Sequence, residues 1–216
     1  MKKYKMLIFD MDGTILYTLE DLKNTTNYAL NEHGFPERTL EEVRRFVGNG
    51  IHKLIERAVP EGTSDADIEA VFTTFEIYYK DHCMDTTRPY DGINDLLTKL
   101  RAKGYMTAVV SNKVDFAVQD LVKDFFVGQF DIAIGEREGV RKKPAPDSVY
   151  EVLKEFHLGK DEVIYIGDSD LDYATARNAG VDCILVEWGF RDRAFLESLG
   201  ATVFAKKPED ILKIVG

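Results

Sequence analysis

One stretch near the start of the chain decides its fold: residues 6–14 read MLIFDMDGT. The apolar half has the pattern of a strand buried on both faces, as in the middle of a parallel sheet. Asp10 then lies at the carboxyl end of that strand, the edge where ligands bind in open α/β sheets. Because Gly13 permits a sharp turn, we expect Asp10, Asp12 and the Thr14 hydroxyl to converge on one small volume.

The two neighbouring carboxylates, Asp10 and Asp12, repel each other and need a positive charge nearby. At a separation of roughly 4 Å and an effective dielectric near 20, they repel each other by about 4 kcal/mol. We therefore expect a cation between Asp10 and Asp12. The alternative, for an isolated Asp-x-Asp-Gly sequence, is a strand followed by a solvated turn, and the rest of the chain decides between the two.

The composition is that of a globular protein without a nucleic-acid partner. The 216 residues are 44% hydrophobic and 31% charged, enough for one large domain or two small ones. The formal net charge of -10 argues against nucleic acid and anionic membrane surfaces, which both bind basic patches. No apolar run approaches the length that spans a bilayer, so we expect a cytoplasmic protein. Cys83 and Cys183 lack metal-ligand spacing, and we predict reduced thiols and no zinc site.

Helical patterns fill the first part of the chain and alternate with strands in the rest. Between the opening strand and residue 87, apolar spacing and capping residues predict helices at 19–33, 39–46, 51–59 and 64–85. Further helices are predicted at 92–103, 114–126, 147–157, 171–179, 193–199 and 209–215. Strands are predicted at 106–110, 130–134, 163–166 and 183–186, with a last one near 202–203.

This order predicts an α/β fold with a doubly wound parallel sheet, a Rossmann-like core. The opening strand needs a sheet to join, and only the chain beyond residue 88 supplies one. We therefore predict a discontinuous core from residues 1–16 and 88–216, with residues 17–87 inserted as a helical module. The alternative is that the inserted helices pack on the same sheet.

Two later stretches place polar or charged side chains at defined points of the backbone. Ser111 and Asn112 follow an apolar strand, although Ser-Asn is also a common helix start. Lys143 lies in the basic run RKKPAPD, residues 141–147, where two prolines restrict the backbone. A solvated surface is the alternative for this run.

A fourth stretch concentrates acids after another buried strand. Residues 164–172 read IYIGDSDLD, which places Asp168, Asp170 and Asp172 close together at a strand end. Carboxylates this dense need neutralisation, or their pKa values rise. Hard oxygen ligands without histidine or cysteine favour Mg²⁺.

Together and in this order, the four stretches resemble the motifs of the haloacid dehalogenase-like superfamily of phosphohydrolases. The resemblance covers nearly the whole chain and is closest to the phosphoglycolate phosphatase-like group, on FVGNG (46–50), PYDG (89–92) and KPAPD (143–147). It implies that residues 17–87 form a helical cap. It also implies hydrolysis of a small phosphorylated metabolite with Mg²⁺ as the cofactor.

The resemblance assigns roles to the core residues. Asp10 is expected to be the nucleophile that forms an aspartyl-phosphate, and Asp12 the general acid and base. The expected contacts to phosphoryl oxygens come from Thr14, Ser111, Asn112 and Lys143. The expected metal ligands are Asp10, the backbone carbonyl of Asp12, and Asp168, while Asp172 holds a metal-bound water or positions Lys143.

Substrate choice is expected to come from the cap. Asn49, His52 and Lys53 follow a Gly-x-Gly turn, where the resembling group places substrate contacts. The alternative is an ordinary exposed helix start. Phosphoglycolate is a plausible substrate, while pyrophosphate, a sugar phosphate or a nucleoside monophosphate stay open.

Other functions and assembly states also stay open. A β-phosphoglucomutase-like phosphoryl transfer is one, although Thr14 favours hydrolysis. A non-catalytic signalling module that accepts a phosphoryl group, as receiver domains do, is another; such modules lack both an inserted cap and the Asp-x-Asp-Gly-Thr sequence. Sequence does not decide between a monomer and a homodimer.

Overall fold

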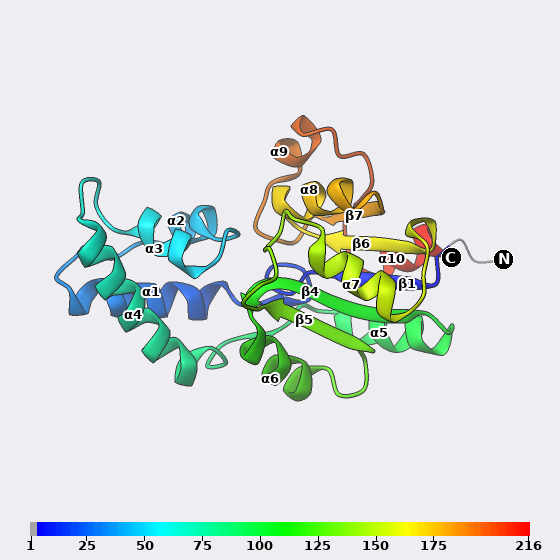
Figure 1. The fold of residues 1–216 in the computed structure, drawn as a ribbon, viewed down its shortest axis with the longest axis horizontal. Coiled ribbons are helices and arrows are strands. Elements are labelled where there is room, and N and C mark those ends of the chain that lie inside the picture. The colour runs from blue at the N-terminus through cyan, green and yellow to red at the C-terminus, as the bar shows by residue number, and fades with distance from the viewer. Residues whose placement is uncertain (1–3) are drawn as a thin grey trace. The chain divides into compact units, whose positions relative to one another are not determined.

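The computed structural model describes residues 4–216, so residues 1–3 of the predicted core lie outside the described part of the chain. The chain divides into two compact units (Figure 1). One consists of Met1–Leu16 and Pro89–Gly216, and the other of Tyr17–Arg88. At the two crossings lie short strands that pair with each other, β2 (Leu16–Tyr17) and β3 (Arg88–Pro89). The sequence patterns did not predict these strands.

The first unit is built around a six-stranded sheet in which all pairings are parallel, which confirms the predicted α/β class. The strand order is β5-β4-β1-β6-β7-β8. The strand bounds are Met6–Phe9 (β1), Met106–Val114 (β4), Ile132–Glu136 (β5), Val163–Gly167 (β6), Asp182–Val186 (β7) and Phe204–Ala205 (β8). Phe9 pairs with Val109 of β4 and with Ile166 of β6. The carboxyl ends of these three strands therefore meet at one edge.

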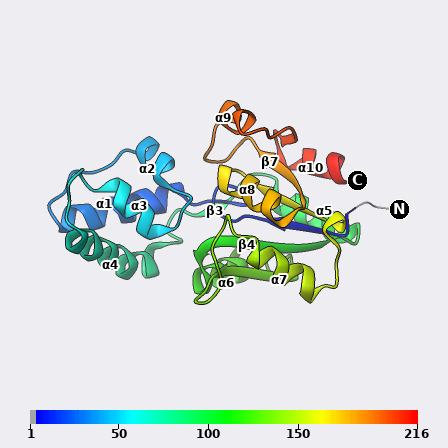
Figure 2. The ribbon, with the colours of Figure 1, turned by 45° about the horizontal axis from the view of Figure 1, so that its top comes forward.

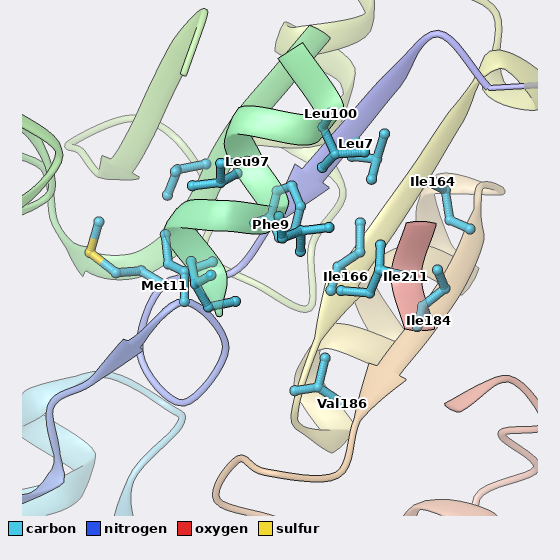
Figure 3. Close-up of a cluster of buried hydrophobic side chains, with 14 of the residues drawn as sticks. Leu7, Phe9, Met11, Leu97, Leu100, Ile164, Ile166, Ile184, Val186 and Ile211 are labelled. Carbon is cyan, nitrogen blue, oxygen red and sulfur yellow. The ribbon is translucent and has the colours of Figure 1, made fainter. Parts of the chain in front are cut away.

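Helices cover both faces of this sheet. Successive residues of each strand point to opposite faces, so the side chains of β1 divide between two apolar clusters. Leu7 and Phe9 of β1 belong to an apolar cluster with α5 (Ile93–Ala102) and α10 (Pro208–Val215), drawn in Figure 3. Ile8 belongs to the opposite cluster, with residues of α7 (Asp147–Glu155) and α8 (Asp170–Ala179). All of β1 is buried, as predicted.

The described part of this unit has three further elements. They are α6 (Asp115–Phe125), which packs against β4 and β5, the 3₁₀ turn η1 (Lys160–Glu162) before β6, and α9 (Arg193–Ser198). Leu196 of α9 packs on Leu185 of β7.

The second unit is helical, as the sequence predicts (Figure 2). Its helices are α1 (Leu19–Glu32), α2 (Leu40–Phe46), α3 (Ile51–Ala58) and α4 (Asp65–His82). The predicted capping box of α2 is present, with Thr39 and Glu42 bonded to each other's backbone N–H groups. No helix in the described part of the chain has the length and apolar character needed to cross a membrane.

Three strands differ from their predicted bounds by two residues or more, among them β5, which lies at 132–136 rather than 130–134. β4 continues past Val110 to Val114 after a shift of register against β5, so its polar end belongs to the sheet. The last strand lies at 204–205 rather than 202–203. The reason is its register with β7: Leu185 N–H donates to the Val203 carbonyl and Glu187 N–H to that of Ala205, which places Ala205 in the core.

Candidate active site

The predicted core residues lie at the edge formed by the carboxyl ends of β1, β4 and β6. Asp10 directly follows β1, and its N–H donates to the carbonyl of Ile166, 2.8 Å away. Ser111 is buried within β4, and Asp168 follows β6. Lys143 comes from the loop before α7 and is also buried. Four segments that are far apart in sequence thus meet at one place.

A cluster of buried carboxylates forms the centre of this edge. Asp10, Asp168 and Asp172 each offer one oxygen, and these oxygens lie within 4.8 Å of one another. Burial, and then the charge of Asp172, raises the pKa of Asp10 well above its usual range. The same causes raise the pKa of Asp168 to about 7. The three carboxyl groups therefore need a nearby cation if all of them are to be ionised at the same time.

Lys143 supplies one cation to the cluster. Its Nζ lies 2.8 Å from Oδ1 of Asp10 and 2.7 Å from Oδ1 of Asp172. Burial lowers the pKa of Lys143, but the charges of these two acids outweigh it and hold the pKa well above its usual range. Lys143 is therefore an ammonium ion between the predicted nucleophile and Asp172.

Asp172 uses both of its oxygens within the protein. Its Oδ2 accepts hydrogen bonds from the N–H groups of Asp168 (3.1 Å) and Ser169 (3.0 Å) and from the Ser169 hydroxyl (2.6 Å). Its Oδ1 accepts from Lys143 Nζ and from the Tyr165 hydroxyl, 3.3 Å away. These contacts suit a residue that positions Lys143, one of the two roles expected of it.

Asp168 is held by two loops. Its Oδ1 accepts from the Thr14 hydroxyl (3.2 Å) and its Oδ2 from the Phe190 N–H (2.7 Å). Both loops approach so closely that a Cβ at Gly13 would lie 2.5 Å from Asp168 Oδ2, and a Cβ at Gly189 would overlap Asp168 Cβ. Glycine at these two positions is what allows the loops to fix the carboxylate.

The donor set fits a divalent metal ion. Asp10 and Asp168 are the better candidates to hold it, because each oxygen of Asp168 accepts one of the hydrogen bonds described, whereas Oδ2 of Asp172 accepts three and its Oδ1 accepts two. Oδ1 of Asp10 is buried and, within the described part of the chain, accepts no hydrogen bond of good geometry despite its ion pair with Lys143. Hard carboxylate donors of this kind select a hard cation.

The side chain of Asp12 lies outside the carboxylate cluster and pairs with a second lysine. Lys113 Nζ lies 3.0 Å from Asp12 Oδ1 and 3.4 Å from Asp12 Oδ2. The Lys113 side chain is 3% exposed and that of Asp12 19% exposed. The metal contact predicted for Asp12 runs through its backbone carbonyl and stays a prediction.

Comparison with known proteins agrees with this geometry. Residues 7–186 match the model of the haloacid dehalogenase-like hydrolase family. The chain belongs to this family. Among curated relatives of this hydrolase, the phosphoglycolate phosphatase of Nitrosospira multiformis is 31% identical over 193 residues, covering 87% of this chain and 85% of that protein. The phosphoglycolate phosphatase of Mannheimia succiniciproducens is 28% identical and covers 99% of both chains.

A solved structure resembles the hydrolase over its whole length. It is a proposed phosphoglycolate phosphatase from Lactobacillus delbrueckii subsp. bulgaricus, with a TM-score of 0.95 and 40% sequence identity. The match covers 100% of this chain and 99% of that one.

The other two residues predicted to hold phosphoryl oxygens, Asn112 and Ser111, also have partners within the hydrolase. The Asn112 amide pairs with the backbone of Lys143: its Nδ2 donates to the Lys143 carbonyl (3.2 Å), and its Oδ1 accepts from the Lys143 N–H (2.8 Å). Asn112 thus fixes the loop that carries Lys143. The Ser111 hydroxyl accepts from the Lys113 N–H at 3.2 Å. Their phosphate contacts stay predictions.

The cap residues of the hydrolase are engaged within their own unit. Asn49 accepts a hydrogen bond from Arg57 Nη2 (2.8 Å). His52 contacts Glu56 and Glu69, and Lys53 contacts Glu56. The hydrogen bond to Glu69 is the main cause that raises the pKa of His52. Substrate contacts by Asn49, His52 and Lys53 stay predictions.

Sequence reasoning missed two parts of the site. Lys113 was passed over because β4 was expected to end before it, although a lysine beside Ser111 was visible in the sequence. The loop at 187–192, which supplies the Phe190 N–H, was also passed over. Trp188 in this loop donates from Nε1 to the Thr14 carbonyl at 3.0 Å. A Trp-Gly pair directly after a buried strand was the available signal.

Proposed function

We propose that this hydrolase is a Mg²⁺-dependent phosphatase that cleaves small phosphomonoesters through an aspartyl-phosphate on Asp10. It is a phosphatase of small phosphate esters. The observation that carries the proposal is the Asp10 carboxylate, held between the Lys143 ammonium and the acids that fit a divalent ion. Mg²⁺ is preferred because the donors are carboxylate oxygens.

The protein's own groups account for the two halves of the reaction. An oxygen of Asp10 bonds to phosphorus, and the bond from phosphorus to the leaving oxygen breaks; Asp12 gives that oxygen a proton. Water then bonds to phosphorus as Asp12 accepts its proton, and Asp10 is released. Lys143, with Thr14 and Ser111, stabilises the phosphoryl oxygens. The bound metal ion supplies charge neutralisation at the attacking carboxylate.

Phosphoglycolate is the substrate we favour. The support is the activity named for the curated relatives from Nitrosospira multiformis and Mannheimia succiniciproducens, together with Lys53 as a cation for the substrate's carboxylate. We further infer a cytoplasmic enzyme, monomeric or homodimeric, without a nucleic-acid or membrane partner. The net charge of -10 and the two cysteines, neither of which forms a disulfide, support this assignment.

The test is Mg²⁺-dependent phosphate release from phosphoglycolate, p-nitrophenyl phosphate, pyrophosphate, sugar phosphates and nucleoside monophosphates. We expect one small ester to give a kcat/KM within the usual enzyme range of about 10⁴ to 10⁸ M⁻¹s⁻¹. Asp10→Asn keeps the shape of the side chain and removes the attacking carboxylate, so it should abolish turnover. Retained turnover in that variant, or no release by the wild type with any substrate, would overturn the proposal.

A further inference from the structure

Lys113 is a buried cation at the site to which the predicted roles assign no task. It lies on β4 two residues after Ser111, and its ammonium is within 3.0 and 3.4 Å of the two oxygens of Asp12. Burying a lysine is costly unless it is paired. The Asp12 carboxylate provides such a partner at this edge of the sheet.

The backbone around Lys113 is held firmly in place. Gly135 of β5 packs so closely that a Cβ on it would lie 2.7 Å from the Lys113 carbonyl oxygen and 2.5 Å from Cα of Asp115. The Gly135 N–H also donates to Asp115 Oδ1 at 2.8 Å. Because the neighbouring strand fixes the chain at 113–115, the Lys113 side chain starts from a well-defined position.

The two buried lysines contact different acids. Lys143 contacts Asp10 and Asp172, whereas Lys113 contacts Asp12. In the proposed reaction Asp10 forms the bond to phosphorus and Asp12 handles protons. Lys113 therefore contacts the residue proposed for proton transfer.

We infer that Lys113 is a positioning residue that fixes the Asp12 carboxyl group for proton transfer to the leaving oxygen. This inference rests on the proposed function. As the bond from phosphorus to the leaving oxygen breaks, its electron pair stays on that oxygen, which takes the Asp12 proton and departs as an alcohol. The Lys113 ammonium then faces the carboxylate that remains on Asp12.

The leaving group provides a test that a purely structural role would not pass. An alkoxide needs a proton as it leaves, whereas p-nitrophenolate leaves without one, so only alkyl esters depend on proton transfer from Asp12. The quantity to compare is kcat/KM, because it reports the step in which the leaving group departs. The substrates are p-nitrophenyl phosphate and the best alkyl phosphate of the panel.

For Lys113→Met we expect a loss of kcat/KM of about 10- to 100-fold with the alkyl ester, a part of the 10²- to 10⁴-fold typical of general acid catalysis. With p-nitrophenyl phosphate we expect kcat/KM to fall less than about threefold, since the leaving group of that ester needs no proton from Asp12. Lys113→Arg keeps a cation and should recover part of the alkyl activity. Lys142→Met is the matched control: this half-exposed lysine pairs with Glu136 at 2.5 Å, and its removal should leave both substrates unchanged.

Equal losses on both esters, or no loss on either, would overturn the inference while leaving the proposed phosphatase intact. If the wild type cleaves neither ester, the proposed function itself has failed. Folding of each variant is checked by its thermal midpoint. If Lys113→Met does not fold, Lys113→Gln is measured in its place, and the same ratio between the two esters decides.

Discussion

Replacing Asp172 by alanine tests how the carboxylate cluster is held. The Asp172 side chain is fully buried and accepts hydrogen bonds from the backbone of Asp168, from the backbone and hydroxyl of Ser169, and from Tyr165 and Lys143. Alanine removes this acceptor from the N–H groups of Asp168 and Ser169, whereas the Tyr165 hydroxyl keeps the Val110 carbonyl, 3.1 Å away. It also leaves Lys143 with Asp10 as its remaining acidic contact in the cluster.

The size of the effect follows from opposing contributions. Removing one partner of a buried ion pair costs about 3–5 kcal/mol, because the other charge stays buried. Asp172 also repels Asp10 and Asp168, since its charge contributes to their raised pKa values. Relief of that repulsion offsets part of the cost. We therefore expect Asp172→Ala to lower the free energy of unfolding by about 3 kcal/mol, the lower end of that range. For a chain of this length each kcal/mol lowers Tm by about 2–4 °C, which predicts a fall of about 6–12 °C.

The measurements are urea unfolding for the free energy and thermal unfolding for Tm, both followed by tryptophan fluorescence, because the chain's single tryptophan, Trp188, belongs to the sheet-containing unit. Asp170→Ala is the matched control: Asp170 is a neighbouring acid whose half-exposed side chain pairs with Arg191 at 3.3 Å. Its loss should cost less than about 1 kcal/mol. If Asp172→Ala costs no more than Asp170→Ala, the hydrogen bonds described for Asp172 do not hold the cluster.

Three further predictions follow from other parts of the structure. Gly189→Ala places a Cβ in overlap with Cβ of Asp168, so calorimetry should show Mg²⁺ binding at least about tenfold weaker, as expected when a neighbour of a metal ligand is disturbed; unchanged affinity would refute the close contact. Cys183 is partly buried, and this burial raises the pKa of its thiol, so DTNB should react with it more slowly in the folded protein than in guanidinium, and equal rates would contradict this. His52 has its pKa raised above 6.5 mainly by Glu69, so NMR should place its midpoint above that value. The pair then stabilises the cap below pH 6.5, and this contribution is lost as the pH rises through the folded-state pKa; Glu69→Gln should lower the midpoint.

The parts of the site that were predictable depend on local order in the sequence. An apolar run followed by Asp10 identifies a strand end whatever the rest of the chain does, and the same holds for Asp168 after β6. Once both strands are expected to be parallel and adjacent, their acids must lie at one edge. The convergence of these two acids therefore follows from the order of residues along the chain.

The parts that were not predictable depend on the path of the backbone through space. Lys113 contacts Asp12 because β4 resumes its pairing with β5 after a register shift, and no periodicity signals such a shift. The Phe190 N–H contacts Asp168 from a loop 22 residues away. The contact of the Asn112 amide with the backbone of Lys143 was not predictable either, because a side chain next to a converging loop has several possible partners.

The charge balance of the site links these contacts to the proposed chemistry. Asp12 and Lys113 balance each other as a pair, whereas Asp10, Asp168 and Asp172 share Lys143, which leaves two negative charges in excess when all are ionised. A divalent cation cancels that excess. A phosphate ester then approaches a neutral site rather than a repulsive one, despite the chain's net charge of -10. The same balance distinguishes the two lysines: Lys143 offsets part of the charge of the three-acid cluster, whereas Lys113 contacts Asp12 outside that cluster.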